Sequence, residues 1–340
     1  MDVAVKDDTI ALVWQNDDSD TSMSYVSTNS LDAPVDLSYP SAIPIDERDD
    51  VGVRHARVIW PDANPMILWA SRESGVQSIK MAELDVPASS LSVPIELYHD
   101  HHSALSQVVY HPSGELGITW TDWADEGSDP NAFFGRFTMA GDAIEIQELS
   151  DGEYSYAPQL EALSDGYTFA FTHYLDEPDH SNALMKHYSF SGGMDMSPTR
   201  LNTDDGRFIA GAVTATMDQE LALMYHEVAP GLRLLSLNRL PDGEAVSIPL
   251  FLMSGSADAL GSPDGEDAFI GWCTPEMPGS PSSIAAIRVS SSSVTLMFYQ
   301  EMEGDGVYCE DVELTMHGEE PMIFWLDTKN TISFRSLCLP

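Results

Sequence analysis

The chain has 340 residues, of which 15 are Lys or Arg and 55 are Asp or Glu, so its formal charge at pH 7 is −40. Nucleic acids and anionic membranes bind basic surfaces that neutralise phosphate, so this balance argues against both as partners. No apolar run approaches the roughly 18 residues of a membrane span. An apolar content of 43% is ordinary for a chain with a core, so the sequence indicates a folded protein with an acidic surface.

Short apolar runs that end in an aromatic residue recur along the whole chain. Neighbouring terminal aromatics are 47 to 55 residues apart. A turn signal such as Pro112–Gly114 precedes nearly every run, and another short strand precedes each turn. A polar loop and a third alternating strand follow each aromatic. The seven terminal aromatics are Trp14, Trp69, Trp120, Phe171, Tyr225, Trp272 and Trp325.

Strand–turn–strand–loop–strand at a period of about 50 residues is typical of a β-propeller blade. The sequence therefore predicts an all-β fold, a single seven-bladed β-propeller over residues 1–340, whose last blade has three strands or is completed by upstream sequence. The alternative is a two-sheet sandwich of many short strands, against which the matching aromatics argue. In a propeller these aromatics fill the space between neighbouring sheets. The predicted blades are 2–45, 50–98, 103–150, 155–203, 207–250, 255–300 and 307–340.

Two segments carry a resemblance to known repeats. Residues 108–120 contain "HPSGELGITW" and residues 261–272 contain "SPDGEDAFIGW". Both resemble the strand–turn–strand of WD40-type and TolB-type propeller repeats, which implies the fold and no particular activity. The Trp-Asp dipeptide of WD40 repeats and the Asp-box of sialidases do not recur here.

The first strand of each blade is expected to line a central channel. One equivalent position in these strands is mostly polar, while the next residue is apolar in every blade, so strand alternation is expected to direct the polar set into the channel. The channel wall is then either merely solvated or a polar ring that binds a cation or a small polar ligand. The polar set is Asp2, Arg57, Gln107, Gln159, Ala212, Asp258 and Asp311.

A duplicated loop gives the most specific local signal. Residues 121–132 and 172–183 both match Thr-x-aromatic-x-Asp-Glu-x4-Asn-Ala and follow the core aromatics of adjacent blades. Trp123 and Tyr174 are extra aromatics that suit stacking on a sugar ring or gripping a basic side chain. Nearby acidic residues supply the oxygen ligands that Ca²⁺ takes. The alternative is a blade duplication whose loops only cover the rim. The acidic residues predicted to bind ligand are Asp125, Glu126, Asp176 and Glu177.

The three cysteines and the first residues bear on the compartment. Cys273 follows a second strand and Cys309 precedes a first strand of the neighbouring blade, so we expect these two to form a disulfide and Cys338 to stay unpaired. The first residues show no signal peptide. We expect a mature extracellular or periplasmic domain of a bacterial protein, and the alternative is a cytoplasmic protein.

Function follows less directly than fold. No nucleophile elbow, phosphate-binding loop or catalytic Cys motif is present, so no catalytic residue is predicted. We expect a binding module that recognises a basic protein segment, a cation or a carbohydrate through an acidic, aromatic-bearing face. Ca²⁺ is the one cofactor considered, and a metal site stays unknown. The alternative is a carbohydrate-active hydrolase or lyase with its site at the channel mouth.

Overall fold

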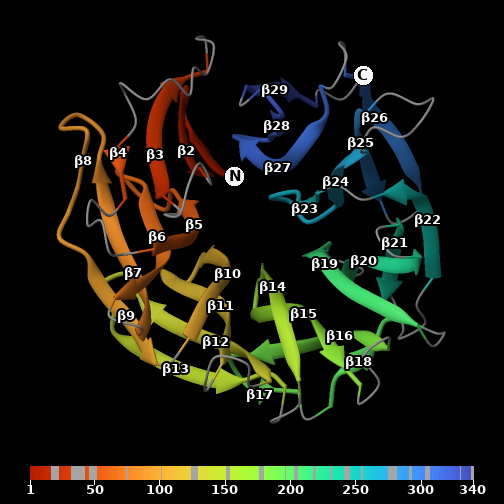
Figure 1. Cartoon of the computed structure of the whole chain (residues 1–340), viewed down its shortest axis with the longest axis horizontal. Helices are drawn as coiled ribbons and strands as arrows, with labels where there is room; N and C mark the ends of the chain where they lie inside the picture. The colour runs from red at the N-terminus through yellow and green to blue at the C-terminus, as the bar shows by residue number, and fades with distance from the viewer. Residues whose placement is uncertain are drawn as a thin grey trace.

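The computed structural model describes most of the chain, and all regular structure in the described residues is β-strand (Figure 1). No described helix is long and apolar enough to cross a membrane. The described residues are 1–16, 23–31, 43–45, 52–73, 76–100, 102–123, 129–150, 154–175, 180–195, 197–202, 206–216, 220–229, 232–240, 246–253, 256–274, 282–290, 293–302, 307–329 and 331–337.

Three antiparallel sheets form the first part of the chain. The first comprises β1 (Asp2–Lys6), β2 (Thr9–Asn16), β3 (Met23–Ser30) and β4 (Ile43–Pro44). The second comprises β5 (Gly52–Ile59), β6 (Met66–Glu73), β7 (Val76–Asp85), β8 (Ser90–Leu91) and β9 (Ile95–Asp100). The third comprises β10 (His102–His111), β11 (Glu115–Trp123), β12 (Pro130–Thr138) and β13 (Ala143–Glu148).

Two meanders follow, and one parallel residue pair, Ser181 with Arg207, joins them into a nine-stranded sheet. The first meander comprises β14 (Ser155–Leu163), β15 (Gly166–Tyr174) and β16 (Ser181–Ser189), with β17 (Gly193–Met194) and β18 (Thr199–Arg200) paired to β16. The second comprises β19 (Arg207–Ala215), β20 (Glu220–Ala229), β21 (Leu232–Leu240) and β22 (Val246–Met253).

The last two sheets complete the chain. One comprises β23 (Ala257–Gly261), β24 (Asp267–Thr274), β25 (Ser283–Ser290) and β26 (Val294–Glu301). The other comprises β27 (Cys309–His317), β28 (Glu320–Asp327) and β29 (Ile332–Ser336). Figure 1 shows the sheets arranged radially around one axis, with the first strands of successive sheets nearest that axis.

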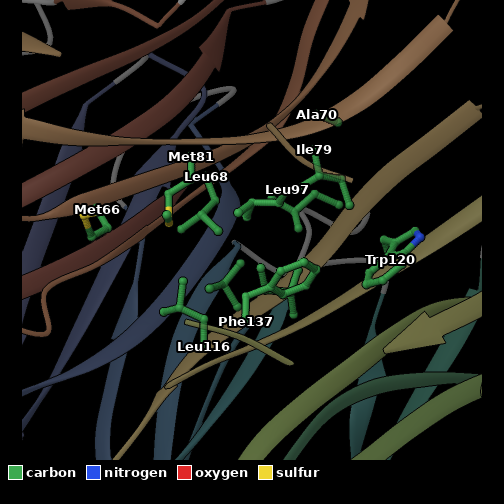
Figure 2. Packing of buried hydrophobic residues seen from close by; sticks show 12 residues of the cluster. Met66, Leu68, Ala70, Ile79, Met81, Leu97, Leu116, Trp120 and Phe137 are labelled. Carbon is green, nitrogen blue, oxygen red and sulfur yellow. The ribbon is translucent and has the colours of Figure 1, made fainter. Parts of the chain in front are cut away.

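The core lies between neighbouring sheets. β11 and β15 are buried almost throughout, because each is the second strand of a sheet covered on both faces. Figure 2 shows one such layer, where Met66, Leu68 and Met81 of the second sheet pack with Trp120 and Phe137 of the third. Trp69 and Trp272 are fully buried in equivalent layers. The prediction that the terminal aromatics are core residues is confirmed at these positions.

Tyr225 departs from the matching register of the other aromatics. Trp69, Trp120, Phe171, Trp272 and Trp325 each pack against the sheet that precedes their own. Tyr225 instead packs with Trp272 of the sheet that follows, while its neighbour Met224 faces the preceding one. A bulge between Ala210 and Val213 shifts the pairing of β19 with β20 here. Because side chains alternate along a strand, Met224 occupies the place predicted for Tyr225.

The ring closes without a shared strand among the described residues. The first sheet pairs only β1 to β4, and the last pairs only β27 to β29. Val3 and Leu12 of the first sheet pack against Met322 and Phe324 of the last. The amino group of Met1 contacts Asp311 Oδ2 at 2.6 Å. Side-chain contacts therefore join the two ends of the ring.

Candidate functional site

Five carboxylates and one guanidinium gather around the axis of the ring. We call Asp2, Arg57, Glu161, Asp258, Asp311 and Glu313 the axial cluster. All six lie on innermost strands, namely β1, β5, β14, β23 and β27. Each interacts electrostatically with at least one other member. The cluster thus draws on both halves of the chain and exists only when the ring is assembled.

Two of these carboxylates bind the backbone of the next innermost strand. Asp2 Oδ2 accepts a hydrogen bond from the Val58 N–H at 2.5 Å, and Asp258 Oδ2 accepts one from the Leu314 N–H at 2.7 Å. Each bond spans 56 residues of sequence, so the two aspartates make the same link at different junctions of the ring. At these two places the predicted polar residue therefore joins neighbouring sheets.

Burial governs the ionisation of the axial carboxylates. It raises the pKa of Glu161 to about 8, with Asp258 adding to the effect. It also raises the pKa of Asp258 to about 7, against hydrogen bonds from the Leu314 and Ala259 N–H groups. The pKa values of Asp2 and Glu313 are raised for the same first cause, while Arg57 lowers both. Part of the cluster is therefore protonated near neutral pH.

The register explains which axial residues sequence reasoning missed. In β27, a bulge between Cys309 and Asp311 puts Glu313 opposite Phe324, the residue before the core Trp325. Asp2 pairs at the matching position with Val13, so Glu313 rather than Asp311 is its counterpart. Glu161 lies two residues beyond Gln159 on the same face of β14. Glu161 is the one charged residue of β14, and this was its only signal.

The other predicted members of the polar ring lie on innermost strands but make simpler contacts. Arg57 Nε donates to the Ser106 carbonyl at 2.9 Å, which links the second and third sheets. Gln159 Nε2 donates to the Ala157 carbonyl at 3.3 Å, within its own strand. Gln107 is half-buried, and Ala212 is buried. Over the described residues, no group of three or more His, Cys, Asp or Glu side chains is arranged to hold a metal ion.

A second group of side chains lies where first strands begin and second strands end, on what we call the mouth face. Tyr174, at the end of β15, lies beside Tyr154 and Tyr156, and we call the three rings the tyrosine platform. The centroid of the Tyr174 ring lies 4.6 Å from that of Tyr154 and 5.2 Å from that of Tyr156. The Tyr174 hydroxyl donates to the Tyr156 hydroxyl at 3.1 Å, and the Tyr174 N–H donates to the Tyr154 carbonyl at 2.8 Å.

The tyrosine platform is accessible at its edge. Tyr154 is 39% exposed and Leu175, beside it on this face, is 41% exposed. Sequence reasoning singled out Tyr174 but missed Tyr154 and Tyr156, which alternate at the entry to β14. Trp123 ends β11 at the position equivalent to Tyr174 and is half-buried. The predicted ligands Asp125, Glu126, Asp176 and Glu177 lie outside the described residues.

The structure also joins Cys273 and Cys309 in a disulfide across the last two sheets, with Cα atoms 5.7 Å apart. Both cysteines are buried, in the layer that holds Trp325. Cys338 lies outside the described residues.

Comparison with solved structures identifies the architecture. The beta-propeller domain of the Trilobed protease from Pyrococcus furiosus matches with a TM-score of 0.55 and 11% identity, over 100% of this chain and 97% of that one. The chain is a β-propeller. An acylaminoacyl peptidase of Pyrococcus horikoshii matches with a TM-score of 0.53 and 12% identity, over 99% of this propeller and 50% of that chain.

A Trypanosoma rangeli sialidase matches the propeller with a TM-score of 0.50 and 8% identity, over 88% of this chain and 56% of that one. Neither a family model nor a curated protein matches the sequence. At these identities the similarities establish the fold alone, as the resemblance to propeller repeats implied.

Proposed function

We propose that this propeller has seven blades and is a binding module that recognises its ligand on the mouth face. The count follows from dividing the nine-stranded sheet at the single Ser181–Arg207 pair, which leaves two meanders of ordinary blade size. The proposed blades are 2–45, 50–98, 103–150, 155–203, 207–250, 255–300 and 307–340.

The tyrosine platform carries this proposal. Tyrosine combines an apolar ring with a polar hydroxyl and loses little conformational entropy when it binds, so it is favoured at recognition surfaces. Tyr174 lies against two other tyrosine rings and its hydroxyl is hydrogen-bonded to that of Tyr156, and these contacts restrain the platform before any ligand arrives. The ligand classes are a basic protein segment, a carbohydrate or a cation such as Ca²⁺, which takes carboxylate oxygen ligands.

The test is calorimetric titration of the intact protein with hexalysine, with calcium chloride and with a panel of oligosaccharides. Binding of at least one probe that weakens in both Tyr154→Ala and Tyr174→Ala supports a binding module on the mouth face. If no probe binds, or if both variants bind the probe as tightly as the wild type does, the proposal is wrong.

The axial cluster favours a second candidate, a carbohydrate-active hydrolase or lyase. Glu161 and Asp258 interact, and their pKa values of about 8 and about 7 suit a carboxylic acid that donates a proton at neutral pH. Hydrolysis of chromogenic glycosides that disappears in Glu161→Gln would support this candidate. Absence of turnover across a broad substrate panel would reject it.

The disulfide between Cys273 and Cys309 supports an exported protein, extracellular or periplasmic, because disulfides persist in oxidising compartments. The alternative is a cytoplasmic protein. The strong negative charge continues to argue against nucleic acid and membrane insertion as modes of binding.

A further inference from the structure

The surroundings of the tyrosine platform narrow its ligand class. Arg207 lies two strands away from Tyr174 in the same row of the sheet, because Tyr174 pairs with Ser181 and Ser181 pairs with Arg207. Asp129 lies exposed on the same face, one residue before β12. Burial raises the pKa of the Tyr154 hydroxyl, Tyr174 and Asp129 add to the rise, and Arg207 opposes it. A carboxylate and a guanidinium therefore both act on the exposed ring.

We propose that the tyrosine platform binds a neutral carbohydrate, with one sugar ring stacked on Tyr154 and its hydroxyl groups paired with Asp129 and Arg207. This rests on the proposed binding function and names its ligand. A sugar ring presents an apolar C–H face and a rim of hydroxyl groups that both donate and accept hydrogen bonds. The platform offers an aromatic face, one anionic acceptor and one cationic donor, and these features match that ring.

The same pair of charges disfavours the two charged ligand classes. A cationic side chain is attracted to a tyrosine face but is repelled by the neighbouring guanidinium of Arg207. An anion meets the opposite problem at Asp129. The net charge of −40 raises the local concentration of cations, but this field is screened within about 8 Å at physiological salt and is not specific to the platform.

The geometry also explains why one ring is the contact surface. Tyr174 and Tyr156 are half-buried and their rings stack on one another, so they support the binding surface rather than form it. The hydrogen bond between the Tyr156 and Tyr174 hydroxyls restrains the orientation of these two rings. Tyr154 is the most exposed member of the platform, at 39%, and is therefore the ring on which a ligand ring can stack.

The experiment titrates the intact protein with three neutral probes, cellohexaose, chitohexaose and mannohexaose, and with hexalysine and hexagalacturonate as charged ones. We expect at least one neutral probe to bind at millimolar concentration or below. Tyr154→Ala should weaken that binding about tenfold or more, since an aromatic stacking contact and its buried area are lost. Tyr299→Ala is the control, because Tyr299 is 56% exposed on the outer strand β26, away from the mouth face.

The variants Asp129→Asn and Arg207→Gln then test the role of the charges. Each should weaken binding of the neutral probe, and Arg207→Gln should improve binding of hexalysine. Binding of hexalysine alone, lost in Tyr154→Ala, would overturn the carbohydrate inference and leave the binding module intact. Failure of all three neutral probes, or a neutral probe that binds Tyr154→Ala and Tyr299→Ala equally well, would also overturn it.

Discussion

Replacing Glu161 with glutamine should flatten the dependence of stability on pH. In the folded protein burial raises the pKa of Glu161 to about 8, whereas the ordinary value that applies to the unfolded chain is 4.5. Below pH 4.5 the carboxyl is protonated in both states and its contribution to stability is fully present. Between these values the folded state binds the extra proton, so the free energy of unfolding falls as pH rises.

The loss of stability follows from the pH interval between the unfolded and folded pKa values of Glu161. One proton corresponds to about 1.4 kcal/mol per pH unit. Over the interval from 4.5 to about 8, this amounts to at most about 5 kcal/mol for Glu161. Asp258 titrates in an overlapping range of pH, from 3.8 to about 7, and its charge acts on Glu161. A loss of this size is a large part of the 5–15 kcal/mol, roughly, that stabilises a typical domain.

The assay is urea unfolding, followed by tryptophan fluorescence, at intervals from pH 4.5 to 8.5. The wild type should lose stability steadily across this range, and Glu161→Gln should show a slope smaller by about one proton. The two proteins should therefore differ little at pH 4.5 and most at pH 8.5. Glu319→Gln, in the exposed turn between β27 and β28, is the matched control. A wild type whose stability rises with pH, or a parallel slope in Glu161→Gln, would refute the reasoning.

Three further measurements probe other parts of the fold. Arg136→Ala should lower the free energy of unfolding in urea by about 3–5 kcal/mol, because it leaves the buried Glu115 carboxylate without its partner. Arg136 donates two hydrogen bonds to Glu115, each of 2.8 Å. A loss of stability no larger than that of the exposed Arg335→Ala would contradict this. Mass spectrometry without reduction should find one disulfide, and reducing the bond between Cys273 and Cys309 should lower stability by about 2–4 kcal/mol; three free thiols would show that the pair is not oxidised. The melting temperature should rise with sodium chloride or divalent cation, because screening relieves repulsion within a chain of charge −40; a melting temperature flat in both would reject that view.

The sequence predicted the fold well because the decisive signal is periodic. Buried second strands between covered faces require apolar runs, and the turn before each run is marked by Gly, Pro or Asp. Blade-sized repeats of these signals survive weak similarity between copies. The register within single strands was harder to predict. Bulges beside Ala210 and Asp311 shift the pairing without leaving any mark in composition, so Tyr225 and Asp311 were assigned to positions that Met224 and Glu313 occupy.

The candidate site was predictable only in part. Tyr174 stood out because its loop is duplicated in the neighbouring blade. Tyr154 and Tyr156 belong to the approach to the first strand, and only pairing of β14 with β15 brings them beside Tyr174. Glu161 interacts electrostatically with Asp258, on a strand almost a hundred residues further along the chain, and no local pattern encodes that interaction.

The closure of the ring has a mechanical consequence. No described strand is shared by the first and last sheets, so these two sheets can part while each keeps its own backbone hydrogen bonds. Separation there costs only the packing of residues such as Val3 and Phe324 and a few polar contacts. Every other junction is crossed by the chain itself. The junction between the first and last sheets is therefore where the ring opens first under mechanical force. A covalent bond across this junction would stiffen the whole molecule.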